Sequence, residues 1–95
     1  MIFVKEHIHN DRKLISLCDG NLIGKEFEEK DFTIKISKSF YLGEPMFEKE
    51  IIGLAQEGVL LNIIGEESVN FALKNNLIQK AGIKRIKNIP FALVL

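Results

Sequence analysis

The sequence has few of the features that mark secreted or membrane proteins. It contains a single cysteine, Cys18, so an intramolecular disulfide is excluded and a reducing compartment is expected. No apolar run approaches the roughly 18–20 residues that a membrane-spanning helix needs. The first residues also lack a charged segment followed by an apolar core, so we expect no signal peptide. These absences predict a soluble, cytoplasmic protein without a membrane partner.

An excess of charge of one sign is also lacking, because 13 basic residues balance 13 acidic ones. The whole chain therefore has no field that would attract a polyanion. The balance hides an asymmetry, since residues 1–67 carry 8 basic and 13 acidic side chains, whereas residues 68–95 carry five basic side chains and no acidic one. The apolar fraction of 46% is ample for one core, and residues 1–95 are expected to form a single globular domain.

The stretch from Val59 to Ile78 carries the clearest structural signal. Residues 59–64 form an apolar, largely β-branched run that predicts a strand buried on both faces. After Gly65, an apolar stripe at Val69, Ala72 and Leu73 predicts a helix. We expect Gly65 at the junction because a side chain there would clash or would require an unfavourable φ.

The first third of the chain alternates between apolar and polar residues. Residues 2–9 and 13–18 predict a hairpin with a two-residue turn at Asp11-Arg12, which pairs Ile8 with Ile15. A third strand is expected from Phe32, with Phe32, Ile34 and Ile36 directed inward. The pattern leaves the segment 22–31 open between a short helical turn and a tight loop.

The remaining elements complete an α+β arrangement. Pro45 suits the first turn of a helix and Gly58 suits its end. Two closing strands, residues 82–87 and 91–95, are expected to be joined through Asn88-Ile89-Pro90. The resulting order is β-β-β-α-β-α-β-β, a two-layer sandwich with a mixed sheet of about five to six strands and two main helices.

Candidate functional residues fall into several groups. His7, His9 and Cys18 share one face of the predicted hairpin, but zinc needs four ligands or three and water, and because no fourth ligand is evident we predict no metal.

Basic residues of the last third could contact phosphates, although lysines also guard solvated strand edges. They are Lys74, Lys80, Lys84, Arg85 and Lys87. Polar residues of two loops that flank one strand could converge on a small-molecule or enzymatic site. They are Asp19, Lys25, Tyr41 and Glu44. Structural roles are predicted for Gly24, Gly58, Gly65 and Asn76, and no catalytic residue or cofactor is assigned.

Several segments together resemble an archaeal family known only as domain of unknown function 424. The segments are CDGNLIGKEF (Cys18–Phe27), SFYLGE (Ser39–Glu44), NIIGEESVNFALKNNLI (Asn62–Ile78) and IKNIPFALVL (Ile86–Leu95). Within them the family pattern is matched at Asp19, Leu22, Gly24, Lys25, Phe27, Tyr41, Gly43, Asn62, Gly65 and Val69. The resemblance implies a compact α+β domain and an archaeal source, and it implies no established activity.

The chain departs from the family pattern at two places. The family is expected to have Pro-His-Ala-Gln where this chain has Pro90-Phe91-Ala92-Leu93, so a site that used the histidine and glutamine is absent or altered here. The family usually has glycine where Asn76 stands, a change that the left-handed conformation tolerates. His7 and His9 have no counterpart in the pattern.

The leading hypothesis is a non-catalytic binding module that engages RNA or a ribonucleoprotein of the translation-type machinery. It rests on the basic segment 68–95 and on an exposed loop that carries Lys25, Lys38 and Tyr41. One alternative is the small-molecule or enzymatic site around Asp19. Another is a subunit that docks onto a protein through the C-terminal strand FALVL.

Overall fold

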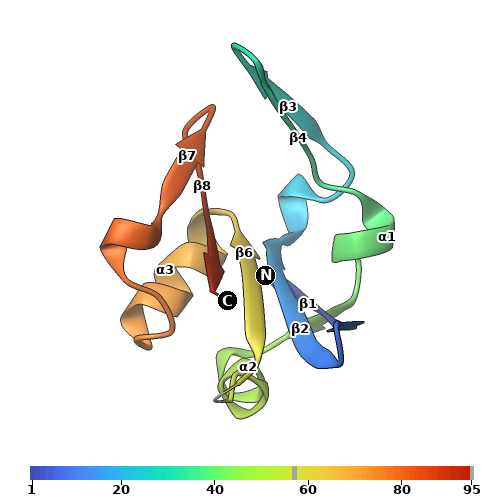
Figure 1. Ribbon diagram of the computed structural model, residues 1–95, viewed down its shortest axis with the longest axis vertical. Coiled ribbons are helices and arrows are strands. Elements are labelled where there is room, and N and C mark those ends of the chain that lie inside the picture. The colour runs from blue at the N-terminus through green and yellow to red at the C-terminus, as the bar shows by residue number, and fades with distance from the viewer. Residues whose placement is uncertain (57, 95) are drawn as a thin grey trace.

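The computed structural model describes residues 1–56 and 58–94, with the side chain of His9 excepted. Within these residues the main sheet has six strands in the order β5-β1-β2-β6-β8-β7 (Figure 1). The strands are β1 (Ile2–His9), β2 (Arg12–Asp19), β5 (Glu44–Met46), β6 (Leu60–Ile64), β7 (Lys84–Ile86) and β8 (Ile89–Val94). β2 and β6 run parallel and the other neighbours run antiparallel. The predicted α+β fold with a mixed sheet is therefore confirmed.

Two apolar cores lie on opposite faces of this sheet. On the helix side, Leu17 and Ile63 of the central strands pack with Val69 and Phe71 of α3 (Glu66–Lys74), next to α2 (Glu48–Leu54). On the other side, Cys18 and Ile64 pack beneath α1 (Lys38–Tyr41) and the hairpin of β3 (Glu26–Glu29) and β4 (Phe32–Lys35). Figure 1 shows α1 and α3 on opposite sides of the sheet. Because successive side chains of a strand alternate between faces, β2 and β6 must be apolar on both.

The β1–β2 hairpin forms where the alternation predicts it, but its register differs. His9 pairs with Arg12 and Ile8 with Lys13, so the predicted pairing of Ile8 with Ile15 is wrong by two residues. The turn is Asn10-Asp11, with φ values of 50° and 63°. Two-residue hairpin turns favour positive φ at both positions, which Asn and Asp tolerate well. A shift of two residues keeps every side chain on its predicted face.

The middle of the chain departs most from the predicted arrangement. Segment 22–31, for which the sequence left a helical turn and a loop as alternatives, contains the end of η1 (Gly20–Leu22) and all of β3. β3 forms a separate two-stranded sheet with β4. Phe32 was expected to point into the core, but its side chain is 73% exposed. Pro45 lies in β5 and does not begin a helix, because α2 starts at Glu48.

The second half of the chain follows the predicted order closely. Gly65 has φ +112° between β6 and α3, and Asn76 has φ 59° just beyond α3. The closing hairpin turns at Lys87-Asn88, with φ values of 50° and 64°, so Ile89 and Pro90 belong to β8 and do not form the connection. Leu95, the last residue of the predicted strand, lies outside the described residues.

Candidate binding groove between two hairpins

Asp19 lies at the end of β2 and its side chain points to the helix side of the sheet. Its carboxylate accepts hydrogen bonds from the backbone N–H groups of Glu67 (3.0 Å) and Ser68 (2.8 Å) and from the Ser68 hydroxyl (2.7 Å). Orphan N–H groups of a helix start are commonly satisfied by such an acceptor. Asp19 and Ser68 are both buried, so the carboxylate is part of the junction between β2 and α3.

Tyr41 lies on the opposite face, above the hairpin-side core. Its hydroxyl donates to Asn62 Oδ1 at 3.4 Å, and burial raises its pKa above the ordinary value. Lys25 and Glu44 are exposed, and Glu44 stands in β5 opposite Val4. Because Asp19 and Tyr41 face away from each other across the sheet, the four predicted loop residues do not converge on one site.

The basic residues of the last third are also divided. Lys74 pairs with Glu48 (3.1 Å), and Arg85 pairs with Glu66 (3.0 Å), at the two ends of α3. With a rise of roughly 1.5 Å per residue, those ends are about 12 Å apart. Among the described residues, the side chains of Lys80, Lys84 and Lys87 form no ion pair. The expected phosphate patch is therefore reduced to separate lysines.

The candidate zinc ligands have other contacts. The His7 ring stacks on Phe40 with centroids 4.2 Å apart, and its Nε2 lies 3.0 Å from the Phe40 carbonyl oxygen. Burial, followed by the charge of Asp19, raises the pKa of the Cys18 thiol to about 12. The His9 side chain lies outside the described ones. In the part of the chain that the structure describes, no three His, Cys, Asp or Glu residues cluster as metal ligands do.

A groove of about 440 Å³ separates the β3–β4 hairpin from the β7–β8 hairpin. The apolar part of its lining is formed by Phe32 and Ile34 on one hairpin and by Ile86 and Phe91 on the other. Figure 1 shows the two hairpins projecting from the same end of the molecule. Ile34 and Phe91 pack against the hairpin-side core and Phe32 extends the apolar surface into solvent, and exposed apolar surfaces of this kind mark binding sites.

The charges around the groove are set by two contacts. Glu29 accepts a hydrogen bond from the backbone N–H of Lys87 (2.9 Å), which links the two hairpins near their tips. Arg85 contributes to the lining but its guanidinium is held by Glu66 and by the carbonyl oxygen of Asn88 (2.9 Å). Lys84 therefore supplies the available positive charge in the lining.

The sequence indicated Lys84 and Arg85 but missed the aromatic part of the groove. Phe32 alternates with Ile34 and Ile36, which is typical of a core strand, and only its position next to the Lys30-Asp31 turn could have indicated exposure. The turn is short, with φ 55° at Lys30, and Phe32 lies at the far end of the hairpin beyond the hairpin-side core.

The fold and the groove define a small α+β domain with a mixed sheet covered by α2 and α3 on one face and by α1 and the β3–β4 hairpin on the other. The chain belongs to the family of proteins of unknown function called DUF424, which it matches over residues 6–95. This confirms the resemblance that was seen in the sequence.

A crystal structure of an uncharacterized conserved protein from Methanopyrus kandleri is similar to this chain, with 26% sequence identity and a TM-score of 0.83. The similarity covers 98% of this chain and 89% of the other. That organism is an archaeon, and the sequence resemblance likewise implied an archaeal source for this chain. No curated protein matches the chain. Within the described residues, no helix has the length and apolarity needed to cross a bilayer.

Proposed function

We propose that this protein is a non-catalytic binding module that holds a single-stranded RNA segment in the groove between its two hairpins. The observation that carries the proposal is that one lining contains both the exposed Phe32 and Lys84, whose ammonium group forms no ion pair with the residues that the structure describes. Proteins that bind single strands combine aromatic rings, on which bases stack, with cations that contact the backbone. The RNA would be free or part of a ribonucleoprotein of the information-processing machinery.

The shape of the groove supports this ligand. Its volume of about 440 Å³ is within the range of roughly 300–1,000 Å³ typical of ligand sites. Phe91 lines the opposite wall, so a base that enters could contact aromatic rings from both hairpins. Every base has an apolar face, and stacking of this kind is tolerant of sequence. We therefore expect little preference among bases.

The charges of the groove set a modest affinity. Lys84 lines it, and Lys87 stands at the tip of the same hairpin, so about two phosphate contacts are available. Each contact with a single strand contributes about −0.7 to the slope of log K against log salt, which gives a slope near −1.4. Binding should be detectable at low salt and should weaken on adding salt, far less steeply than for a strongly basic protein.

Fluorescence anisotropy with a labelled, mixed-sequence, single-stranded RNA tests the proposal. Phe32→Ala should weaken binding about 5- to 150-fold, because one stacked base contributes about 1–3 kcal/mol. Phe47→Ala is the matched control, since Phe47 has the same 73% exposure but lies before α2.

Lys84→Glu should also weaken binding and should flatten the salt dependence, whereas Lys49→Glu on α2 makes the same change of charge away from the groove. The proposal fails if the wild type does not bind RNA at low salt. It also fails if the groove variants bind as well as their controls.

A further inference from the structure

Strand β8 pairs with its two neighbours mainly along different parts of its length, and in the strand register only Phe91 has a partner on both edges. Its residues 91–94 pair with β6, but β7 begins only at Lys84, opposite Phe91, and pairs with residues 89–91. The chain before β7 turns away into η2 (Lys80–Gly82). Among the strands of the described residues, 92–94 therefore pair with β6 alone, and their edge is open on the side where β7 has not yet begun.

The hydrogen bonds show which backbone groups face that open edge. Gly65 donates its N–H to the carbonyl oxygen of Pro90 (2.9 Å), so position 90 directs its backbone carbonyl toward β6. In an antiparallel sheet successive residues direct these groups to opposite edges. The N–H and C=O of Leu93 therefore face the open edge, and the Leu93 side chain is 59% exposed. An extended chain could bond to both groups.

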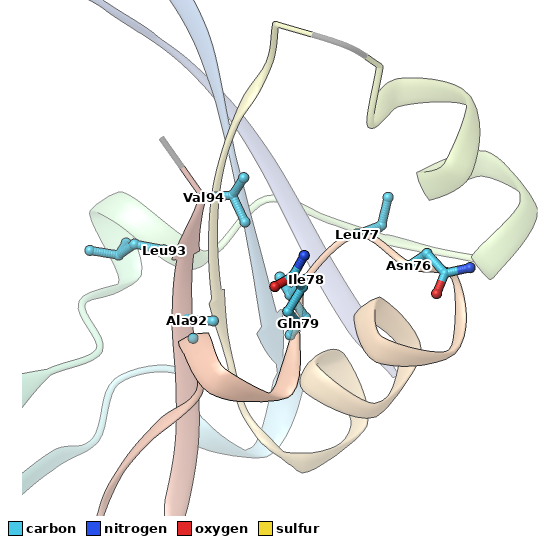
Figure 2. Close-up of a pocket in the computed structure, with 8 residues that line it drawn as sticks. Asn76, Leu77, Ile78, Gln79, Ala92, Leu93 and Val94 are labelled. Carbon is cyan, nitrogen blue, oxygen red and sulfur yellow. The ribbon is translucent and has the colours of Figure 1, made fainter.

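Two hollows flank the same edge and share Gly82, Ala92 and Leu93 in their linings. The larger, of about 370 Å³, lies between β8 and the loop after α3, and its apolar lining includes Ile78 and Val94. Figure 2 shows Ile78 and Gln79 on that loop across from Ala92, with Leu93 pointing away from the loop. An added strand would thus find a hollow for side chains on each of its faces.

Among the described residues that line the two hollows or adjoin their linings in the sequence at η2, the charged side chains are lysines. Neither hollow has a carboxylate among its described lining residues, and Lys84 lines the smaller one, of about 190 Å³. Lys80 lies in η2, next to Gln79 of the larger lining, and is exposed. Positive charge beside a strand edge favours a partner that carries carboxylates, because complementary charges steer and select the partner.

We propose that the open edge of β8 binds an extended, acidic peptide segment of a partner protein as an additional strand. The peptide takes the place that a longer β7 would occupy. Its backbone pairs with Leu93, its apolar side chains enter the two hollows, and its flanking carboxylates lie near Lys80 and Lys84. Main-chain bonds supply affinity and the alternate side chains supply specificity in recognition of this kind.

This peptide site is separate from the proposed RNA groove. The linings of the two share only Lys84 and Phe91. Phe32 variants therefore report on RNA alone and Leu93 variants on the peptide alone, so either proposal can fail without the other.

The test is a titration of ¹⁵N-labelled protein with a peptide of three valines flanked on each side by two glutamates, followed by NMR. We expect shift changes in the backbone amides of residues 79–82 and 92–94. A peptide with lysines in place of the glutamates should bind at least tenfold more weakly. Methylation of the central valine nitrogen should abolish binding, because it removes the N–H that faces Leu93.

Two protein variants complete the test. Leu93→Pro removes the one N–H that faces the open edge and should abolish binding. Because this change could also unfold the protein, Lys80→Glu is the second variant and should weaken binding at least fivefold, whereas Lys49→Glu should not. The proposal is overturned by no binding at millimolar peptide or by equal binding of the lysine or methylated peptide. A dimer that Leu93→Pro dissociates would also overturn it, since the edge would then belong to a second copy.

Discussion

Replacing Asp19 by alanine should destabilise the protein strongly, although Asp19 looks like a loop residue in the sequence. The change removes the carboxylate that accepts three hydrogen bonds from Glu67 and Ser68 at the start of α3. It leaves the N–H and the hydroxyl of Ser68, which is 0% exposed, without their acceptor. Water cannot easily replace that acceptor at a buried position.

The expected loss follows from these bonds. A lost N-cap costs about 0.5–2 kcal/mol, and each buried polar group left unsatisfied costs about 1–3 kcal/mol. These contributions overlap, so we expect Asp19→Ala to lower the free energy of unfolding by about 3–5 kcal/mol. Total stabilities are about 5–15 kcal/mol, so the variant would be folded only marginally. Asp19→Asn keeps one acceptor oxygen and should lose less.

Urea denaturation followed by circular dichroism measures this effect. Asp31→Ala is the control, because Asp31 is an exposed aspartate in the β3–β4 turn, and it should change stability by less than about 1 kcal/mol. The slope of the free energy of unfolding against urea concentration should stay the same if the variants expose the same surface on unfolding. A loss below 1 kcal/mol for Asp19→Ala would show that the carboxylate is not an essential cap and would refute the reasoning.

Further predictions concern the same junction and the two hairpins. Gly65→Ala should cost at least about 2 kcal/mol, because φ is +112° and the new Cβ would lie 2.2 Å from Asp19 Cγ; an unchanged melting temperature would contradict this. The raised pKa of Cys18, from 9.0 to about 12, means that the unfolded chain loses the thiol proton first, so stability should fall as pH rises from 9 to 12. Cys18→Ala should reduce that fall in urea titrations. Glu29→Ala should leave stability within about 1 kcal/mol but should speed hydrogen exchange at the Lys87 amide, and unchanged exchange would argue against the link between the hairpins.

The parts of the fold that could be predicted are those with a local signal. Residues 59–78 contain the whole pattern of β6, Gly65 and α3, so the strand was placed to within one residue and the helix was expected directly after Gly65. The register of the β1–β2 hairpin was missed because a shift of two residues leaves the alternation unchanged, and the turn is set by positive φ at Asn10 and Asp11. Local patterns also hide which sheet a strand joins, and for this reason Phe32 was placed in the core.

The candidate sites were harder to predict because they depend on contacts between distant segments. The groove needs two hairpins, separated by about 50 residues in sequence, to project from the same end of the sheet. Asp19 was assigned to a loop site because its bonds go to residues 48 and 49 positions later. The edge of β8 is open because β7 begins only at Lys84. The sequence does not show at which residue such a strand begins.

The parallel pairing of β2 with β6 has a consequence for how the chain folds during synthesis. The β1–β2 hairpin leaves the ribosome early and can form at once, but the partner of its inner edge, Leu60–Ile64, follows more than forty residues later. Until then the apolar edge of β2 is unpaired, and unpaired edges are prone to join other chains. The centre of the sheet can therefore be completed only after β6 has been made.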